Sequence, residues 1–227
     1  MKSSARRIRR KAAAPRRGHR GDARFRKLAA ELAKAGRNFY ARGWALGTSG
    51  NFSAVVSAKP MRLAITSTGL DKSLLAAVQF LEIDERAQVV RGQGRPSAEA
   101  HLHVAIVRAR GAGAVLHTHS VWSSIVSEAF AAESGLTLEG FEMLKGLSGI
   151  RSHEHREWVP VLKNSQDMPA LAEELAETLR KHPAIHGVLL RRHGLYTWGQ
   201  DLAEAKRHVE IFEFLMEVVG RTRAAGC

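Results

Sequence analysis

The chain has 227 residues, of which 44% are apolar, enough to bury the core of one domain. No run of 18 apolar residues occurs, so the sequence predicts no transmembrane helix, and its basic start lacks the apolar stretch of a secretory signal. The single cysteine, Cys227, excludes an intrachain disulfide and fits a reducing compartment, so we expect a cytoplasmic protein.

The net charge of +13 is concentrated at the start of the chain. Residues 1–20 hold nine Lys and Arg and no acid, which leaves 13 − 9 = +4 on the other 207 residues. We interpret residues 1–22 as a disordered basic extension and residues 23–227 as a single domain. The alternatives are a nucleic-acid arm or an organelle transit peptide. Runs of like charge are mostly solvated tails, so we expect no nucleic-acid partner.

Apolar residues at helical spacing predict helices, and short β-prone runs that end at turn residues predict strands. In chain order these are a helix over 23–41, strands over 54–56 and 61–66, a hairpin over 80–84 and 88–90, a helix from 97 to about 110, a strand over 113–116, a helix over 168–182, a strand over 187–190 and a C-terminal helix from 202. Asp167 is the expected N-cap of the helix over 168–182. This alternation predicts an α/β or α+β sheet covered by helices.

Three His-x-His pairs are candidates for a metal site, and geometry separates them. Residues two apart on a strand share a face, so His117 and His119, at the end of a predicted strand, can reach one cation. Residues two apart on a helix point about 200° from each other, so His101 and His103 are poor chelators. The third pair, at 153 and 155, lies in a charged segment that fixes no direction.

A catalytic metal with imidazole ligands needs a third protein ligand and an open position. His193 fits, because it follows the predicted strand over 187–190 and precedes Gly194, where the backbone can turn sharply. A histidine pair alone is explained better by structural hydrogen bonds than by a metal. The metal hypothesis therefore depends on the other motifs of the chain.

Six short motifs, taken in order, resemble the class II aldolase family. They are GTSGNFS (47–53), ITSTG (65–69), PSAE (96–99), AVLHTHS (114–120), EMLKG (142–146) and RRHG (191–194). The resemblance covers about residues 23–219 and implies an α/β fold with three α/β/α layers. In such a fold a central, mostly antiparallel sheet carries helices on both faces. Similar proteins form ring-like homotetramers with the site near a subunit interface, and we expect the same here.

Within the family, the chain is most similar to a dehydratase branch. The stretches HEHREW (153–158), NSQDM (164–168) and RRHGLYTWG (191–199) support this branch. The resemblance implies a zinc-dependent lyase that dehydrates a small sugar phosphate, 5-methylthioribulose 1-phosphate, in methionine salvage. One alternative is a family aldolase that cleaves fuculose or ribulose phosphate. Another is a non-catalytic binding module like the head of adducin.

The resemblance also implies site residues. The implied ligands of one divalent metal, usually zinc, are His117, His119 and His193. Glu142 of EMLKG is the implied acid/base. Glu99 of PSAE is a second catalytic candidate, and it matches the position from which the family's aldolases place a carboxylate at the metal. Without the motifs, Glu142 is explained by a surface pair with Lys145, and Glu99 by the preference for acids at helix starts.

Phosphate binding is implied for the loops rich in Gly, Ser and Thr. The matching residues are Thr48, Asn51, Thr68, Gly69 and Ser97. Small residues let backbone N–H groups approach an anion, and hydroxyls add donors. Lys72 follows these loops closely and is a candidate to neutralise phosphate charge, although a surface lysine is the simpler interpretation. Ala98 replaces the second Ser of the aldolase pattern, which weakens the aldolase alternative.

Overall fold

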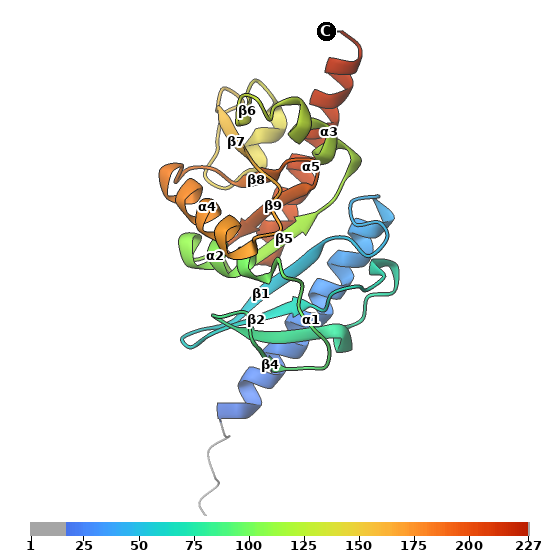
Figure 1. Ribbon diagram of the computed structural model, residues 1–227, viewed down its shortest axis with the longest axis vertical. Helices are drawn as coiled ribbons and strands as arrows, with labels where there is room; N and C mark the ends of the chain where they lie inside the picture. The colour runs from blue at the N-terminus through green and yellow to red at the C-terminus, as the bar shows by residue number, and fades with distance from the viewer. Residues whose placement is uncertain (1–16, 227) are drawn as a thin grey trace, which may run out of the picture.

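The structure is a computed structural model that describes residues 17–226 (Figure 1). Residues 1–16, most of the predicted basic extension, lie outside the described residues, as does Cys227. Helix α1 (Arg17–Ala41) begins six residues earlier than the sequence predicted, so residues 17–22 are helical. Among the described helices, none combines the length and the apolar character that crossing a membrane requires.

Nine strands form one sheet in the order β4-β3-β2-β1-β5-β9-β8-β7-β6. Their bounds are β1 (Asn51–Ala58), β2 (Met61–Thr66), β3 (Phe80–Asp84), β4 (Val89–Arg91), β5 (Ala114–Thr118), β6 (Gly135–Leu138), β7 (Glu157–Leu162), β8 (Gly187–Leu190) and β9 (Gly194–Gly199). Neighbouring strands are antiparallel except β7 and β8. The predicted mostly antiparallel sheet is confirmed, as is the β3–β4 hairpin.

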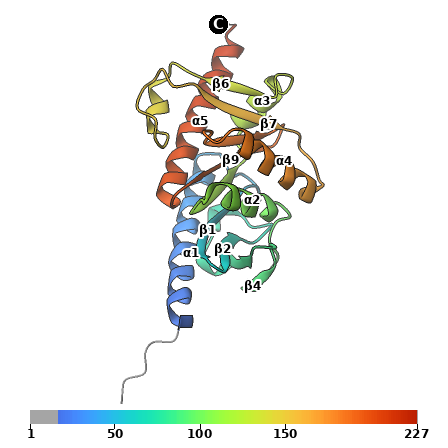
Figure 2. The same ribbon diagram turned by 90° about the vertical axis from the view of Figure 1, so that its left-hand side faces the viewer.

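Helices cover both faces of the sheet (Figure 2). On one face α2 (Ala100–Arg110) packs against α4 (Met168–Lys181). On the other face lie α1 and α5 (Leu202–Ala224), and α3 (Val121–Ala129) packs against α5. Three short 3-10 helices complete the fold: η1 (Lys72–Leu74), η2 (Ala77–Gln79) and η3 (Glu142–Gly146). The three-layer α/β/α architecture expected from the sequence is confirmed.

The pleat of β5 shows why both faces are covered. Val115 packs into the core under α2 and α4, whereas Ala114 and Leu116 pack into the core under α1 and α5. All three are buried, so this central strand reads as a continuous apolar run rather than an alternating one. The polar residues that follow this run therefore emerge at an edge of a rigid, fully packed sheet.

Two helix starts bear on the predictions. Asp167 caps α4 as expected, because its carboxylate accepts a hydrogen bond from the Ala170 N–H at 3.1 Å. Helix α2 begins at Ala100, three residues later than predicted. The preceding residues form a turn in which the Glu99 N–H donates to Ser97 Oγ at 3.2 Å, and this turn places both side chains beside the sheet edge.

Candidate metal and phosphate site

The ends of four strands meet at one edge of the sheet. Strands β5 and β8 run toward this edge, and β1 and β9 start from it, because β1/β5, β5/β9 and β8/β9 are antiparallel pairs. His117 lies on β5 opposite Asn51 of β1, His119 follows β5, and His193 lies in the β8–β9 turn. A Cβ at Gly194 would lie 2.0 Å from the Thr118 carbonyl oxygen, so only glycine lets this turn approach β5.

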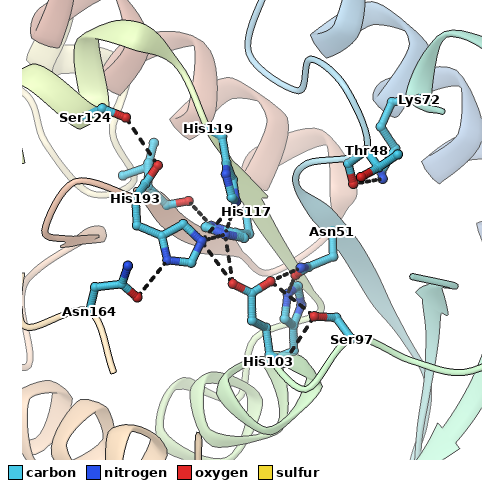
Figure 3. A network of polar contacts seen from close by, with 12 residues as sticks. Thr48, Asn51, Lys72, Ser97, His103, His117, His119, Ser124, Asn164 and His193 are labelled. Carbon is cyan, nitrogen blue, oxygen red and sulfur yellow. Dashed lines mark hydrogen bonds and ion pairs between the residues drawn. The ribbon is translucent and has the colours of Figure 1, made fainter. Parts of the chain in front are cut away.

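The three imidazole rings point toward one another (Figure 3). His117 Nε2 lies 2.7 Å from His119 Nε2 and 3.3 Å from His193 Nε2. The Nε2 atoms of His119 and His193 are 3.1 Å apart. Glu99 adds a carboxylate, with Oε1 3.0 Å from His193 Nε2. One ligand atom from each of the four residues lies within 4.8 Å of the others. The structure therefore brings together the three predicted ligands and adds Glu99.

Hydrogen bonds on the far side of two rings fix which nitrogen faces the centre. His117 Nδ1 donates to the Leu195 carbonyl at 2.9 Å, and His193 Nδ1 donates to Asn164 Oδ1 at 3.2 Å. With Nδ1 as the donor on each ring, the Nε2 atoms of both rings point inward, toward an acceptor-only carboxylate. Lone pairs that converge in this way repel one another unless a cation lies between them, and nitrogen and oxygen donors in this number suit Zn²⁺.

Burial keeps His117 and His119 in the metal-binding form. Loss of solvation lowers the pKa of His117, and it lowers the pKa of His119 to about 2 with help from the neighbouring rings. Neutral imidazole is the form that coordinates a metal ion. The donor set and its protonation state therefore both fit a divalent metal.

Two buried residues that sequence reasoning missed support the cluster. Tyr196 of β9 stacks on the His117 ring, with ring centroids 3.8 Å apart. Glu213 of α5 accepts a hydrogen bond from Thr118 Oγ1 at 2.6 Å and so ties the strand end to the helix layer. Burial raises the pKa of Glu213 to about 7. Glu213 is distant from the histidine motifs in sequence. Tyr196 lies shortly after His193, but nothing local indicates that its ring stacks on His117.

A cavity of about 130 Å³ opens beside the cluster. Its lining includes all six residues predicted to bind substrate: Thr48, Asn51, Thr68, Gly69, Lys72 and Ser97. Glu99 and His119 line the same cavity, so the predicted phosphate pocket and the histidine cluster are continuous. Gly50 is required here, because its φ is +75° and a Cβ would lie 2.8 Å from the His117 carbonyl oxygen.

Lys72 is the one cation among the residues that line this cavity, and it is buried rather than on the surface. Its Nζ donates to the carbonyl oxygens of Thr48 and Leu70, both at 3.0 Å (Figure 3). Burial lowers the pKa of this ammonium to about 8. Two carbonyls leave one of its three N–H groups for an anion, so the simpler interpretation as a surface lysine is wrong.

Comparison with known proteins places this geometry in a family. A sequence profile for the class II aldolase and adducin N-terminal domain matches residues 30–219. The chain belongs to the class II aldolase family. Methylthioribulose-1-phosphate dehydratase of Marinobacter nauticus is 43% identical over 195 residues, which are 86% of this chain and 93% of that protein. The dehydratase of the same name from Methylococcus capsulatus is 41% identical, over 88% of this chain and 96% of that one.

Solved structures of the same family share the fold. The L-fuculose-1-phosphate aldolase of Thermus thermophilus has a TM-score of 0.66 at 25% identity, over 92% of this chain and 97% of that chain. YgbL of Escherichia coli has a TM-score of 0.73 at 24% identity, over 87% of this chain and 90% of that chain. The class II aldolase fold expected from the motifs is thus confirmed.

Glu142 is not brought to the cluster within one chain. It lies on η3, which stands beside α5 in Figure 2, and its side chain is 74% exposed. Its described partners are Lys145 at 2.6 Å and His153 at 3.9 Å, and the four-residue cluster does not include it. The loop after η3 is anchored at the opposite edge of the sheet, where Ser148 O accepts from His186 Nε2 at 2.9 Å.

The His101/His103 pair behaves as geometry predicted, and the pair at 153 and 155, for which geometry made no prediction, lies outside the cluster. His101 is exposed on α2, while His103 is buried, so the two rings do not share a ligand. His155 pairs with the buried carboxylate of Glu157 at 2.8 Å, and His153 is exposed near Glu142. Among the described residues, His117, His119 and His193 with Glu99 form the cluster suited to a metal.

Proposed function

We propose that the protein is a metal-dependent hydro-lyase. It removes water from 5-methylthioribulose 1-phosphate and forms 2,3-diketo-5-methylthiopentyl 1-phosphate in methionine salvage. The observation that carries this proposal is the convergence of three imidazoles and Glu99 beside a cavity with a buried lysine. A ketose phosphate needs both a metal cluster and an anion pocket, and a relative that is 43% identical bears the name of this dehydratase.

The proposed cofactor is one Zn²⁺ per subunit, held by His117, His119 and His193. When bound, it acts as a Lewis acid that stabilises negative charge on the substrate ketone. Three neutral imidazoles suit this task better than thiolates, because they leave the full charge of the ion in place. Two of the rings are oriented for it by acceptors outside the cluster, His117 by the Leu195 carbonyl and His193 by the Asn164 amide oxygen.

The phosphate pocket fixes the position of the reacting carbons. Lys72 supplies a positive charge, and Thr48, Thr68 and Ser97 supply hydroxyl donors around the same cavity. Glu99 lies between this pocket and the histidines, where Asn51 Nδ2 donates to its Oε2 at 2.5 Å. A substrate anchored by its phosphate therefore presents its ketone to the cluster and its hydroxyls to Glu99.

Dehydration requires an acid/base group, and Glu142 is the proposed one. It takes the proton from the carbon beside the ketone and returns it to the hydroxyl that leaves from the next carbon. Water departs, and the resulting enol tautomerises to the second ketone. The pKa of Glu142 is lowered by its hydrogen bond from Lys145, so the carboxylate is ready to accept a proton at neutral pH.

A homotetramer with shared sites completes the proposal. Because Glu142 does not reach the cluster of its own chain, an adjacent subunit supplies it. Large apolar side chains lie exposed on both segments concerned: Val121 and Ile125 on α3, directly after His119, and Met143 beside Glu142. Exposed apolar residues of this kind are typical of surfaces that become buried in an assembly.

Product analysis tests this function. Purified protein loaded with Zn²⁺ is incubated with 5-methylthioribulose 1-phosphate, and the products are identified by mass spectrometry. We expect a loss of one water and a diketone phosphate. Release of dihydroxyacetone phosphate would instead identify a family aldolase, for which the same cluster and pocket also suit the chemistry. A folded protein that binds no metal and turns over neither substrate would indicate an adducin-like module.

The phosphate role of Lys72 gives a separate prediction. Lys72→Met is expected to raise KM about 10- to 100-fold with little change in kcat, because it removes a charged hydrogen-bond donor. The unsubstituted enzyme should show KM rising above pH about 8, since the ammonium, with its pKa lowered to about 8, loses its charge there. Steady-state kinetics between pH 6 and pH 9.5 provide the measurement. Lys59→Met, at an exposed position, is the control. A KM that stays constant across this pH range in the unsubstituted enzyme would contradict the phosphate role of Lys72.

A further inference from the structure

A buried chain of hydrogen bonds lies behind Glu99. Ser53 Oγ is 2.7 Å from His103 Nδ1, and His103 Nε2 contacts Asn51 Oδ1. Asn51 Nδ2 is in turn 2.5 Å from Glu99 Oε2. Figure 3 shows the His103 ring directly beneath Asn51, on the side away from the histidine cluster. Ser53 and His103 are fully buried and Asn51 is 5% exposed, so water does not compete for these bonds.

The chemistry of these groups allows only one donor-to-acceptor direction for the whole series of hydrogen bonds. An ionised Glu99 only accepts, so Asn51 must turn its NH₂ group toward it and its carbonyl oxygen toward His103. That oxygen needs a donor, which is the Nε2–H of His103. Burial lowers the pKa of His103 to about 3, so the ring is neutral and its Nδ1 accepts the Ser53 hydroxyl proton.

This direction decides what the phosphate pocket offers an anion. Asn51 lines the pocket, and its NH₂ group carries two N–H donors, of which Glu99 uses one. The second remains available to an anion in the pocket. If the amide were flipped, its carbonyl oxygen would face both the Glu99 carboxylate and the anion, and all three groups would repel one another.

We propose that His103 is a positioning residue for anion binding. With its tautomer selected by Ser53, it holds the Asn51 amide so that the NH₂ group faces Glu99 and the phosphate. His103 is hydrogen-bonded to none of the proposed metal ligands and acts through Asn51. Its ring also lies edge-on to Tyr196, which stacks on His117, so the metal content of each variant must be measured. The proposal rests on the proposed function in taking the anion to be a phosphate, but it does not depend on which reaction follows.

Binding of inorganic phosphate to the zinc-loaded protein, measured by calorimetry, is the first test. We expect His103→Leu to raise the Kd about 10- to 100-fold, since the pocket loses a donor and gains a carbonyl oxygen that repels the anion. His103→Gln should restore most of the affinity, because its amide can donate to Asn51 and accept from Ser53. His101→Leu, the exposed neighbour on the same helix, is the matched control. Metal content and melting temperature are measured for every variant.

The outcomes separate a positioning role from a structural one. If His103 were purely structural, His103→Leu and His103→Gln would have lower melting temperatures, but the folded protein of each variant would bind phosphate with unchanged affinity. That result would overturn the proposal. Equal Kd values for His103→Leu and the control do the same. Should His103→Leu fail to fold, Ser53→Ala serves instead, with an expected Kd increase of about 2- to 10-fold.

Nitrogen-15 NMR of the imidazole rings gives a readout independent of binding. The Nε2–H tautomer of His103 should persist from pH 5 to pH 8 and shift toward the Nδ1–H form in Ser53→Ala. An Nδ1–H tautomer in the unsubstituted protein would reverse the chain and overturn the proposal. Because neither measurement uses turnover, an enzyme inactive on 5-methylthioribulose 1-phosphate would refute the proposed function without deciding this one.

Discussion

Replacing His117 by Ala is expected to remove the metal and to lower kcat/KM by about 1,000-fold or more, since Lewis-acid stabilisation contributes several kcal/mol. The His117 ring is fully buried on a central strand and lies between the ring of Tyr196 and the imidazoles of His119 and His193. Two of the three proposed histidine ligands remain, and Glu99, whose other oxygen is held by Asn51, would have to take the third place, so we expect the ion to be bound too weakly to survive purification. Elemental analysis of the purified variant, alongside the kinetic assay, measures both effects.

His101→Ala is the matched control, because it also removes one member of a His-x-His pair. His101 is exposed on α2 and contributes to no metal cluster, so its variant should keep metal content and activity. Adding excess Zn²⁺ should not rescue His117→Ala, whereas it should restore unsubstituted protein stripped by a chelator. A His117→Ala protein that retains one metal ion per subunit would show that the ligand set is wrong.

The strands that the sequence predicts to the residue share one property. Strands β2, β3 and β8 are short β-prone runs, and each lies within a few residues of Pro, Gly or charged turn residues. The strands that were missed break this pattern. Pro160 lies within β7, and β9 begins at Gly194, the last residue of the RRHG motif, so no turn residues separate it from the turn after β8. Helix α3 contains three serines and was missed, although Ser120 caps it by accepting from the Ser123 N–H.

The metal cluster was predictable because strand ends place residues in known directions. His117 and His119 flank Thr118 at the end of a strand, and His193 follows another strand. Glu99 was expected at the metal only through its match to the family's PSSE motif, because its contact with the histidines arises from packing of α2 against the sheet and no local pattern reveals it. His103 was correctly excluded as a ligand, but its bond to Asn51 joins residues 52 positions apart, and no local pattern reveals such a contact.

Glu142→Gln is expected to lower kcat about 100- to 10,000-fold, which is the usual contribution of a general acid/base, while leaving metal content unchanged. The amide keeps the size of the side chain but neither accepts nor returns a proton. Glu139→Gln is the control, because this nearby glutamate pairs with Arg156 at 2.7 Å and has no proposed role. Steady-state kinetics with the metal content of each preparation measured in parallel separates a lost base from a lost cofactor.

Mixing two inactive variants tests whether neighbouring subunits share the site. Co-expressed His117→Ala and Glu142→Gln chains assemble into hybrid tetramers. In the proposed site, one chain supplies the metal ligands and its neighbour supplies Glu142. Such a site is intact when the metal ligands come from a Glu142→Gln chain and the carboxylate comes from a His117→Ala chain. Random assembly in equal amounts then restores about a quarter of the sites. If each chain used its own Glu142, no hybrid would contain an intact site. An inactive mixture of well-formed tetramers would therefore show that Glu142 does not act across an interface.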